Sequence, residues 1–575
     1  MTRNPILNFT LPAWRSRVLI ALFLLSFLGL IGRAVYLQGM HNEILQKRGE
    51  SRSSRVVEMP AHRGMITDRH GEPLAISTPV KSLWANPAGV HATNSQLRKL
   101  AELAEVNVAE IRKKISNKKR DFVYLKRHLS PDVADKIVDL GIPGIFFDPE
   151  FKRYYPQREI TAQMLGFTNV DDNGQEGIEL GWQEILAGKA GSRRVIKDRK
   201  GRIVEDIEII LTPRPGKDLV LSLDSKIQYR AYRELKHAMD LNKAKAGEIV
   251  VLDPQTGEVL ALVNLPAYNP NNKTGRSGGK SRNRVLTDIF EPGSTMKPFT
   301  VAAALEAGKI KPDTEFDTAP GFITIGRNTI RDSHVEGVLT VEQVIKKSSN
   351  VGTVQIALKL PAQTMWETFN RSGFGSYTGS GFPGEVKGKL RPYQKWRSIE
   401  QATMSYGMGI SVNLLQLARA YTLFSAEGKL KPVSLLRVDK PPVGKQIISR
   451  KTALSVSKML EMAVAKGGTA TLAQIKGYRV AGKTGTAHKV KDGGGYARDK
   501  YISSFVGYAP ASNPRLIIAV MLDEPSAGKY FGGQVAAPVF SRVMADSLRN
   551  LNVPHDAPID KTVSSSLMLR LKGDV

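Results

Sequence analysis

The sequence contains no cysteine and few histidines. Its 575 residues include 0 Cys and 9 His. Disulfides, thiolate nucleophiles and zinc–thiolate centres are therefore excluded. The histidines form no H-E-x-x-H pattern, so we expect no metal site. The lack of thiols does not identify the compartment, although it suits an oxidising one.

Acidic residues are scarce relative to basic ones. The chain carries 83 Lys and Arg against 54 Asp and Glu, a net charge of +29. Basic residues cluster within residues 112–120, 193–202 and 273–284. Such clusters are typical of nucleic-acid binding proteins, but no recognition motif or Cys/His cluster accompanies them. We favour a basic exterior near anionic lipid or an anionic cell-wall polymer, and expect no nucleic-acid partner.

Long hydrophobic runs are absent except for one near the N-terminus. Residues 18–32 are uncharged and apolar, and at 1.5 Å per residue they span about 22 Å, short of a ~30 Å hydrocarbon core. Residues 34–37 extend the run. Arginines in the preceding residues 1–17 predict a cytoplasmic tail. Because no Ala-x-Ala-like cleavage site follows, we predict a transmembrane anchor over 18–39 rather than a signal peptide, with the rest of the chain exported.

A turn followed by an apolar helix carries the first candidate catalytic residues. The segment Glu291–Pro298 contains a Pro-Gly turn, and residues 299–308 predict a helix that ends at its glycine. Ser294 therefore lies at a helix start, where free backbone N–H groups favour developing negative charge. Lys297 follows on the same helix face, so the serine can attack while the lysine takes its proton.

This Ser-x-x-Lys spacing is weakly specific. The chain has four other matches, at Ser116/Lys119, Ser277/Lys280, Ser455/Lys458 and Ser526/Lys529. A solvated serine near a lysine is the usual explanation of such a match. Ser294 is distinguished by its turn, by the apolar helix and by two further motifs later in the chain.

The second motif is Ser348-Ser-Asn350, which follows a predicted helix over residues 340–347. It offers a second hydroxyl and an amide to the site, although a polar helix end is an alternative interpretation. Ser281-x-Asn283 and Ser411-x-Asn413 match the same pattern. The motif is therefore weak on its own.

The third motif, Lys483-Thr-Gly-Thr486, follows residues 477–482, which are predicted to form a strand. Gly485 allows close backbone approach, and the hydroxyls of Thr484 and Thr486 suit a carboxylate. A solvated edge strand is the alternative interpretation. Lys273-Thr-Gly275 matches as well, but it precedes the serine and lies in a loop.

Outside the motifs, the C-terminal half predicts an antiparallel sheet with helices. Residues 219–223 are typical of a strand, 226–239 of a helix, and 248–263 of two strands around a Pro/Gly turn. We therefore expect a mixed fold of the α+β class. The predicted domains are an anchored front domain over residues 40–218, a second domain over 219–556 and a tail over 557–575, with the boundary at the turn residues 212–216.

The front domain offers charges without a nucleophile. Residues 95–139 are predicted to be mainly helical, and His70-Gly71 to turn a hairpin. Its conspicuous polar residues are expected to form ion-pair networks and packing hubs rather than a ligand site. They are Arg63, Asp68, Arg69, Arg153, Glu176 and Glu179.

Together, and in this order, the three motifs resemble those of the penicillin-binding proteins and serine β-lactamases. The segments 63–75 and 79–87 are similar to the pedestal of class B penicillin-binding proteins, most closely those of the cell-division FtsI type. Further segments that agree with this family are Arg153–Pro156, Glu176–Glu179, Ser405–Ser411, Ser504–Gly507 and Tyr530–Gly533. The resemblance covers nearly the whole chain.

The resemblance implies a D,D-transpeptidase with that family's fold, which cross-links peptidoglycan stem peptides ending in D-Ala-D-Ala through a serine acyl-enzyme. The implied roles are nucleophile for Ser294, general base for Lys297, proton relay for Ser348, electrostatics and carboxylate binding for Lys483, and substrate binding for Asn350, Thr484, Gly485 and Thr486. The backbone N–H groups of Ser294 and Thr486 would form the oxyanion hole. Burial and the Lys483 ammonium would lower the pKa of Lys297.

The resemblance also implies partners and a location. β-Lactams would be trapped at the same serine, and no metal or cofactor is needed. Partners would be lipid-linked precursor, the membrane, and division proteins that include an FtsW-type glycosyltransferase. The location would be the inner membrane at the division septum, with a single-pass anchor and a periplasmic catalytic domain.

Several alternatives remain open on sequence grounds. A β-lactamase would need a water-activating carboxylate, but no convincing Glu-x-x-Leu-Asn segment is present. A D,D-carboxypeptidase shares the motifs and differs only in letting water resolve the acyl-enzyme, so only the resemblance of the front domain argues against it. An elongation-type transpeptidase is set apart only by the closer similarity of the segments named above to the division type. A class A enzyme would carry a glycosyltransferase domain, which residues 40–220 do not resemble. The alternative that is not an enzyme is a division scaffold or a β-lactam sensor.

Overall fold

The computed structural model describes residues 13–40, 54–197, 203–272, 279–491 and 493–558, which form two compact units. Unit 1 comprises residues 1–61, 79–151 and 189–214, and unit 2 comprises 62–78, 152–188 and 215–575. Parts of two basic clusters (198–202 and 273–278), most of the predicted cytoplasmic tail (1–12) and most of the C-terminal tail (559–575) lie outside the described residues.

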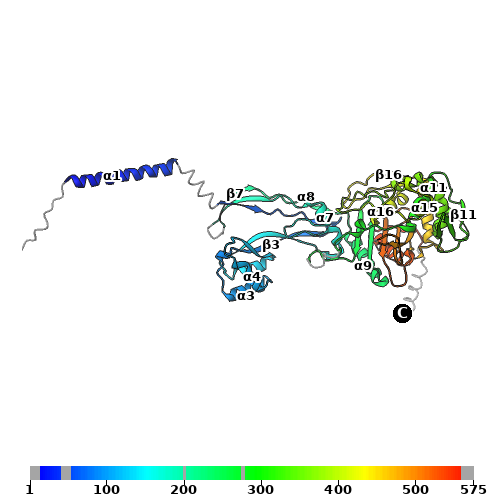
Figure 1. Cartoon of the computed structure of the whole chain (residues 1–575), viewed down its shortest axis with the longest axis horizontal. Helices are drawn as coiled ribbons and strands as arrows, with labels where there is room; N and C mark the ends of the chain where they lie inside the picture. Colours follow the sequence, from blue (N-terminus) through cyan, green and yellow to red (C-terminus); the bar gives the residue numbers. More distant parts are fainter. Residues whose placement is uncertain (1–12, 41–53, 198–202, 273–278, 492, 559–575) are drawn as a thin grey trace, which may run out of the picture. The chain divides into compact units, whose positions relative to one another are not determined.

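Unit 1 begins with one long apolar helix, α1 (Ala13–Val35), continued by the π-turn η1 (Tyr36–Met40). The span Ala13–Gln38 has 26 residues and contains an 18-residue window with a mean hydropathy of 2.4, none of which is buried. At 1.5 Å per residue it is about 39 Å long, enough to cross a hydrocarbon core of ~30 Å. The predicted anchor over 18–39 therefore falls on a single helix of sufficient length (Figure 1).

The rest of unit 1 is a small sheet and a helical lobe. The sheet is antiparallel, in the order β1-β6-β7. The lobe packs α3, α4 and α5 with β4 around one apolar core. The bounds are β1 (Ser54–Met59), η2 (Pro87–Gly89), α3 (Asn94–Leu103), α4 (Val108–Ser116), β4 (Val123–Leu129), α5 (Pro131–Val138), β6 (Gly191–Lys197) and β7 (Ile203–Leu211).

The prediction of a mainly helical segment over residues 95–139 is wrong at β4. Residues 123–129 instead pair antiparallel with residues 81–85. Leu125 and Leu129 point into the lobe core, where they are 3% and 6% exposed. Pairing and burial with a distant stretch therefore override the local helix propensity of this lysine- and leucine-rich segment.

Unit 2 is built on a five-stranded antiparallel sheet in the order β10-β9-β19-β18-β17. Every residue of β9, β10 and β19 is buried, because helices cover both faces of the sheet. Val250 and Leu252 face one apolar core, and Ile249 and Val251 face the other. The strand bounds are β9 (Ala246–Leu252), β10 (Val259–Leu265), β17 (Ala481–Val490), β18 (Tyr496–Ala509) and β19 (Leu516–Asp523).

Two groups of helices cover the sheet of unit 2. One face packs against α9 (Ser225–Asn242) and α20 (Ala537–Asn550). The other packs against the core that contains α11 (Lys297–Glu306), α16 (Leu414–Ala420) and α18 (Arg450–Val464). Figure 1 shows α9 set apart from the group of α11, α15 and α16 within this unit. The α+β class is therefore confirmed.

Shorter elements complete unit 2. They are β2 (Ile66–Thr67), η3 (Arg158–Ile160), α6 (Ala162–Leu165), α7 (Gly177–Gly181), α8 (Gln183–Leu186), β8 (Leu219–Val220), α10 (Arg284–Thr287), η4 (Gly293–Met296), β11 (Glu315–Asp317), β12 (Phe322–Ile325), β13 (Asn328–Arg331), β14 (Val338–Thr340), α12 (Val341–Lys347), α13 (Asn350–Leu358), α14 (Ala362–Arg371), η5 (Tyr393–Lys395), α15 (Ser398–Ser405), α17 (Thr422–Ser425), β15 (Lys429–Leu430), β16 (Lys445–Gln446), η6 (Thr471–Ala473) and α19 (Gly532–Val535). Strands β3 (Pro73–Ala85) and β5 (Ile145–Tyr154) contain residues of both units.

Candidate active site

The turn that carries Ser294 is tied to a second segment of unit 2. Ser294 is half-buried in the 3-10 turn η4, directly before α11. The N–H of Gly293 donates to the carbonyl of Gly407 at 3.2 Å, and Phe290 and Val412 exchange two backbone hydrogen bonds of 3.0 and 2.9 Å. The turn is therefore fixed by residues more than 110 positions away in the sequence.

Glycine is required where the two segments meet. A Cβ on Gly407 would lie 2.1 Å from the carbonyl oxygen of Gly293, and Gly407 has a φ of +86°. Beside it, the N–H of Gly409 donates to the Glu291 carboxylate at 2.7 Å. Burial raises the pKa of this Glu291 carboxyl. The family-like segment 405–411 thus holds the turn of the candidate nucleophile.

Lys297 is fully buried and holds the second motif. Its Nζ donates to Asn350 Oδ1 at 2.8 Å, to Ser348 Oγ at 3.2 Å and to the Ser348 carbonyl oxygen. Burial, and then the nearby Lys483 ammonium, bring the pKa of Lys297 well below its ordinary value. A lysine in this environment can be a neutral amine near neutral pH and so can accept a proton.

The Ser348–Asn350 segment is shaped by a carboxylate that the sequence did not point to. Ser348 has a left-handed backbone with φ of +60° between α12 and α13. Asp332 accepts hydrogen bonds from Ser349 Oγ at 2.6 Å, from the N–H of Val351 at 3.0 Å and from the N–H of Asn350. These bonds at the start of α13 hold the unusual backbone in place.

Lys483 approaches the same hydroxyl from the sheet. It is fully buried on β17, and its Nζ donates to Ser348 Oγ at 2.9 Å and to Thr484 Oγ1 at 3.3 Å. Burial lowers the pKa of Lys483 to about 7. Two buried lysines therefore share one serine hydroxyl, an arrangement that concentrates positive charge and proton-transfer capacity in one place.

The strand β17 lies against the turn of Ser294. A Cβ on Gly485 would lie 2.8 Å from the carbonyl oxygen of Pro292, and one on Gly293 would lie 3.2 Å from that of Thr486. Thr486 is half-buried, and its hydroxyl accepts a hydrogen bond from the N–H of Gly532 at 3.0 Å. The hydroxyl of Thr484 is buried and lies 3.1 Å from that of Thr469.

The three motifs thus converge in one place. Hydrogen bonds join Lys297, Ser348, Asn350 and Lys483, and Ser294 lies one turn before Lys297 at the start of the same helical segment. Among the described residues, the Ser294 hydroxyl forms no side-chain hydrogen bond. Catalytic contacts are often loose before substrate arrives. The arrangement has the parts of a nucleophile, a base, a relay and a fixed cation.

The conspicuous charges of residues 62–78 and 152–188 form a separate structural group within unit 2. Arg63 and Arg153 each donate to the buried carboxylate of Glu179 at 2.7 Å. Asp68 instead accepts from the backbone of His70 at 2.8 Å and of Glu72 at 2.9 Å. The expected ion-pair hub therefore centres on Glu179.

Two further members of this group are engaged elsewhere. Glu176 accepts from Ser281 Oγ at 3.0 Å, and no ion pair of Glu176 is found in the part of the chain that the structure describes. Arg69 pairs with Glu258 at 3.3 Å. Both contacts lie within unit 2 and bring no nucleophile with them.

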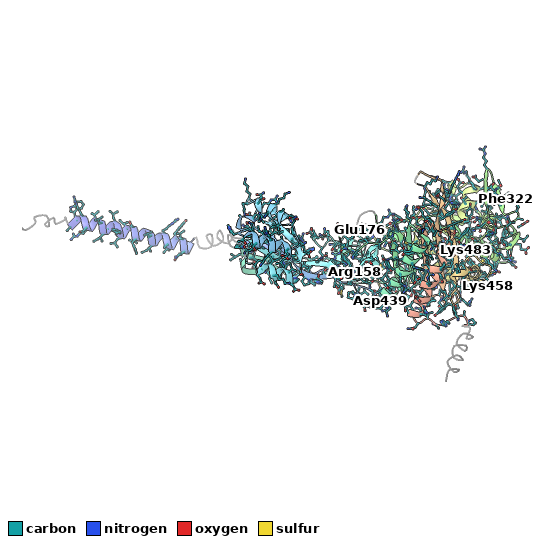
Figure 2. The ribbon with its side chains drawn as sticks, turned by 90° about the horizontal axis from the view of Figure 1, so that it is seen from below. Arg158, Glu176, Phe322, Asp439, Lys458 and Lys483 are labelled. Carbon is teal, nitrogen blue, oxygen red and sulfur yellow. The ribbon has the colours of Figure 1, made fainter. Side chains whose placement is uncertain are left out.

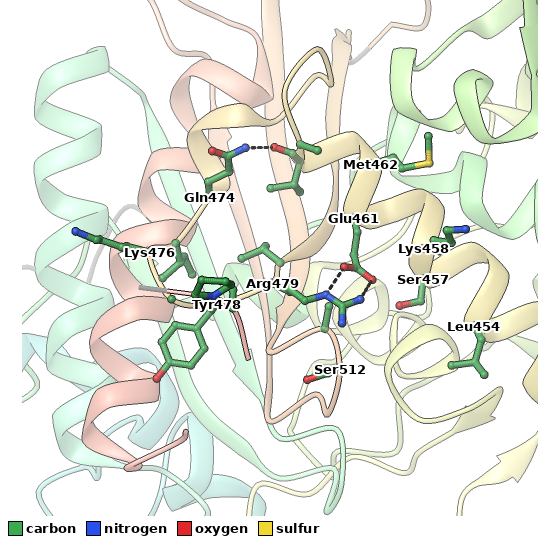
Figure 3. A pocket seen from close by; sticks show the side chains of 18 residues that line it. Leu454, Ser457, Lys458, Glu461, Met462, Gln474, Lys476, Tyr478, Arg479 and Ser512 are labelled. Atoms are coloured by element: carbon green, nitrogen blue, oxygen red, sulfur yellow. Dashed lines mark hydrogen bonds and ion pairs between the residues drawn. The ribbon is translucent and has the colours of Figure 1, made fainter. Parts of the chain in front are cut away.

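A cavity in unit 2 lies away from these residues. It has a volume of about 890 Å³ and is lined by residues of α18 and by the loop before β17, including Lys458, Glu461 and Arg479. Arg479 forms a two-bond ion pair with Glu461, as Figure 3 shows. No candidate catalytic residue lines this cavity, so its size does not identify the active site. Within the described ranges, no group of three or more His, Asp or Glu residues is arranged to hold a metal ion.

Comparisons with known proteins agree with this geometry. The chain matches the family model of the penicillin binding protein transpeptidase domain over residues 247–545 and that of the penicillin-binding protein dimerisation domain over 58–221. It is 43% identical over 548 residues to the probable peptidoglycan D,D-transpeptidase PenA of Neisseria meningitidis, covering 95% of this chain and 94% of the relative.

Two further relatives point the same way. The peptidoglycan D,D-transpeptidase FtsI of Escherichia coli is 42% identical over 551 residues, which cover 95% of this chain and 93% of the relative. The apo transpeptidase domain of Burkholderia pseudomallei penicillin-binding protein 3 is 49% identical with a TM-score of 0.55, covering 59% of this chain and 98% of that one. The resemblance predicted from the motifs is confirmed, and the chain belongs to the class B penicillin-binding proteins of the FtsI type, the peptidoglycan D,D-transpeptidases.

Proposed function

We propose that this chain cross-links peptidoglycan stem peptides through an acyl-enzyme on Ser294. The observation that carries the assignment is the shared hydroxyl of Ser348, which accepts from both buried lysines at 3.2 and 2.9 Å. One lysine belongs to the helix of Ser294 and the other to the sheet. Attack of Ser294 on a substrate carbonyl needs a base to take the hydroxyl proton and a cation to stabilise the developing charge, and the two lysines supply these groups at Ser348.

Acylation begins with attack of Ser294 Oγ on the carbonyl carbon of the penultimate D-Ala. Lys297, neutral because it is buried beside another cation, accepts the hydroxyl proton. The backbone N–H groups of Ser294 and Thr486 stabilise the oxyanion. As the C–N bond breaks, the proton passes through Ser348 to the leaving amine, and terminal D-Ala departs.

Deacylation uses the same groups in reverse. An amine from a neighbouring stem loses its proton to Lys297 and attacks the acyl-enzyme carbonyl, which restores Ser294 and leaves a new amide bond. A penicillin enters by the same attack, which opens its β-lactam ring and leaves the serine acylated. The protein supplies positioning and charge throughout, and no step of this scheme draws on a further group.

The substrate is held along the edge of the sheet. Strand β17 is the last strand of the sheet order, so one side of it is open to an added strand. Lys483, Thr484 and Thr486 bind the terminal carboxylate, and the Asn350 amide binds the peptide backbone. Gly485 lets this strand lie close to the turn of Ser294, and so close to the attacked carbonyl.

The helix over residues 13–38 anchors the catalytic unit in the inner membrane, with the N-terminus cytoplasmic and the remaining chain periplasmic. The similarity to FtsI supports action at the division septum. It also supports association with an FtsW-type glycosyltransferase and with other division proteins, and use of lipid-linked precursor. The domains predicted from the sequence, 40–218 and 219–556, serve as pedestal and transpeptidase domain.

The test is acylation by a fluorescent penicillin. Full-length protein in detergent is compared with Ser294→Ala and with Ser455→Ala, which alters the other Ser-x-x-Lys match on α18. We expect labelling of the parent and of Ser455→Ala, and none of Ser294→Ala, because removing a nucleophile costs about 10⁶-fold. Equal labelling of Ser294→Ala would show that another serine is the nucleophile. If the parent is folded but takes no label, the protein is better explained as a division scaffold that is not an enzyme.

A further inference from the structure

A hairpin beside the active site presents an arginine over an exposed aromatic ring. Strands β12 (Phe322–Ile325) and β13 (Asn328–Arg331) pair antiparallel with Phe322 opposite Arg331. The guanidinium carbon of Arg331 lies 5.1 Å from the centre of the Phe322 ring. Phe322 is 41% exposed and Arg331 is exposed as well. An arginine stacked on a ring keeps its planar donors pre-organised for a ligand.

The opposite face of this hairpin is anchored in unit 2. Ile330 is 6% exposed and packs with Val354 of α13 and Ala402 of α15, and Ile323 and Ile325 lie against the same cluster. Because side chains alternate along a strand, the Phe322–Arg331 face points away from this core. Figure 2 labels Phe322 in the same unit as Lys483.

The backbone of Arg331 is fixed to the catalytic group. Its carbonyl oxygen accepts a hydrogen bond from Asn350 Nδ2 at 2.7 Å, and the next residue, Asp332, caps α13. Asn350 Oδ1 in turn accepts from Lys297. The Cα of Arg331 therefore lies within about 6 Å of the amide expected to bind the substrate peptide, given standard bond lengths.

The charge of Arg331 has no acidic partner in the part of the chain that the structure describes. A nearby acidic residue is paired with another cation: Glu336 forms an ion pair with Lys347 at 3.0 Å. The side chain of the adjacent Asp332 is turned to the start of α13. The guanidinium is thus a cation on a rigid hairpin, next to the peptide-binding amide and available to an anionic ligand.

The chemistry of the substrate supplies a matching anion. A stem peptide carries its terminal carboxylate, which Lys483 binds, and also the free carboxylate of its γ-linked glutamate a few residues away. An extended peptide advances about 3.3–3.6 Å per residue, so a group two or three residues from Asn350 falls within reach of an arginine at this position. A planar guanidinium binds a carboxylate through two parallel hydrogen bonds.

We propose that Arg331, held over Phe322, binds a second carboxylate of a stem peptide and thereby contributes to substrate selection. The inference rests on the proposed transpeptidase function. The proposal applies to the donor stem and to the acceptor stem, because both carry such a carboxylate. A penicillin has only the carboxylate that corresponds to the substrate terminus, so the Arg331 site is not needed for penicillin recognition.

The experiment measures how well stem peptides protect full-length protein from a fluorescent penicillin. Two peptides are compared that differ only in the glutamate side group, a free carboxylate or a carboxamide. For the parent we expect the free acid to give half-protection at a roughly 5- to 30-fold lower concentration, the range for one charge-assisted contact at a partly exposed site. In Arg331→Gln the two peptides should protect equally.

Controls separate recognition from general damage. The ratio compares two peptides on one variant, so a uniform loss of labelling rate cancels. Arg327→Gln removes a cation from the turn of the same hairpin and should keep the parent's ratio. Phe322→Ala removes the ring but not the charge and should reduce the ratio only in part. Peptides that end in D-Ala-D-Ala test the donor stem, and peptides that lack this end but carry a free side-chain amine test the acceptor.

Two results would overturn the proposal. One is a parent that does not distinguish the acid from the amide in either the donor or the acceptor series. The other is an Arg331→Gln variant that keeps the parent's ratio. Failure of the transpeptidase assignment has a different signature, because the parent would then take no penicillin label even without peptide.

Discussion

Of the serine–lysine pairs of identical spacing in unit 2, two have clearly different surroundings. Ser294 and Lys297 occupy the start of α11, and Ser455 and Lys458 lie within α18. Lys297 is fully buried and bonded to the Ser348–Asn350 segment. Lys458 is exposed at the rim of the 890 Å³ cavity (Figure 3).

The difference lies in what surrounds each lysine rather than in its distance from the serine. Burial beside Lys483 lowers the pKa of Lys297 far enough for it to act as a base. Lys458 is exposed to solvent, and among the described residues it forms no hydrogen bond with the catalytic side chains. Spacing places two side chains on one helix face, whereas tertiary contacts decide whether they can react.

The strongest test of this comparison removes each lysine in turn. Lys297→Ala should lower the second-order rate of penicillin acylation by about 10²- to 10⁴-fold, the usual contribution of a positioned base. Lys458→Ala should leave it within about twofold, because Lys458 touches no part of the catalytic group. Stopped-flow acylation of full-length protein measures both rates, and circular dichroism checks folding. A comparable loss in both variants would contradict the comparison.

A second test moves the serine and leaves both catalytic side chains in place. Gly407→Ala brings a methyl group to 2.1 Å from the carbonyl oxygen of Gly293, so the turn of Ser294 must shift. A displacement of about 1 Å can cost on the order of 10²-fold in rate. We expect a loss of this size in the acylation rate with penicillin.

Gly409→Ala is the matched control for this change. Gly409 also has a positive φ, +80°, but its added Cβ would meet Arg391 Nη2 only at 3.5 Å. It therefore introduces similar backbone strain without the collision. If both variants lost the same activity, strain in the 405–411 segment and not displacement of the turn would be responsible.

Much of this architecture was accessible from the sequence. The turn at Pro292-Gly293 and the apolar run behind it predict a helix, and residues 248–263 predict two strands around a turn. The structure has both, as α11 and as the antiparallel pair β9 and β10. The three motifs predict one site because each places a reactive residue at a recognisable local structure, namely a helix start, a helix end and a strand. Lys297, Ser348 and Lys483 do meet, at 3.2 and 2.9 Å.

The remaining features depend on contacts that no local pattern records. Asp332 lies 17 to 19 residues before the groups it caps, and nothing in its own surroundings in the sequence distinguishes it from other acidic residues. Gly407 is required by the backbone of Gly293, more than 110 residues away. Strand β4 was missed because its partner residues 81–85 decide its conformation.

The smallest expected effect concerns the second buried lysine and pH. Burial lowers the pKa of Lys483 to about 7, and Lys483 must be protonated to hold a carboxylate. Burial and the Lys483 ammonium hold the pKa of Lys297 well below its ordinary value, and Lys297 must be neutral to accept a proton. Acylation should therefore rise with pH as Lys297 loses its proton and fall above about pH 7 as Lys483 loses its own. These apparent values belong to the coupled pair.

Lys483→Arg separates the two limbs of this profile. A guanidinium stays charged at all pH values used, so the falling limb should move up by more than one pH unit while the rising limb remains. The rate at the optimum should drop several-fold, because the planar group does not reproduce the 2.9 Å bond to Ser348 Oγ. Acylation rates between pH 5.5 and about 9.5 give the profile. The same change at an exposed lysine, Lys458→Arg, should leave the profile unchanged. If the rate of Lys483→Arg falls at the same pH as the rate of the parent, the falling limb belongs to another group. The charge of Lys483 would then not be part of the difference between Lys297 and Lys458.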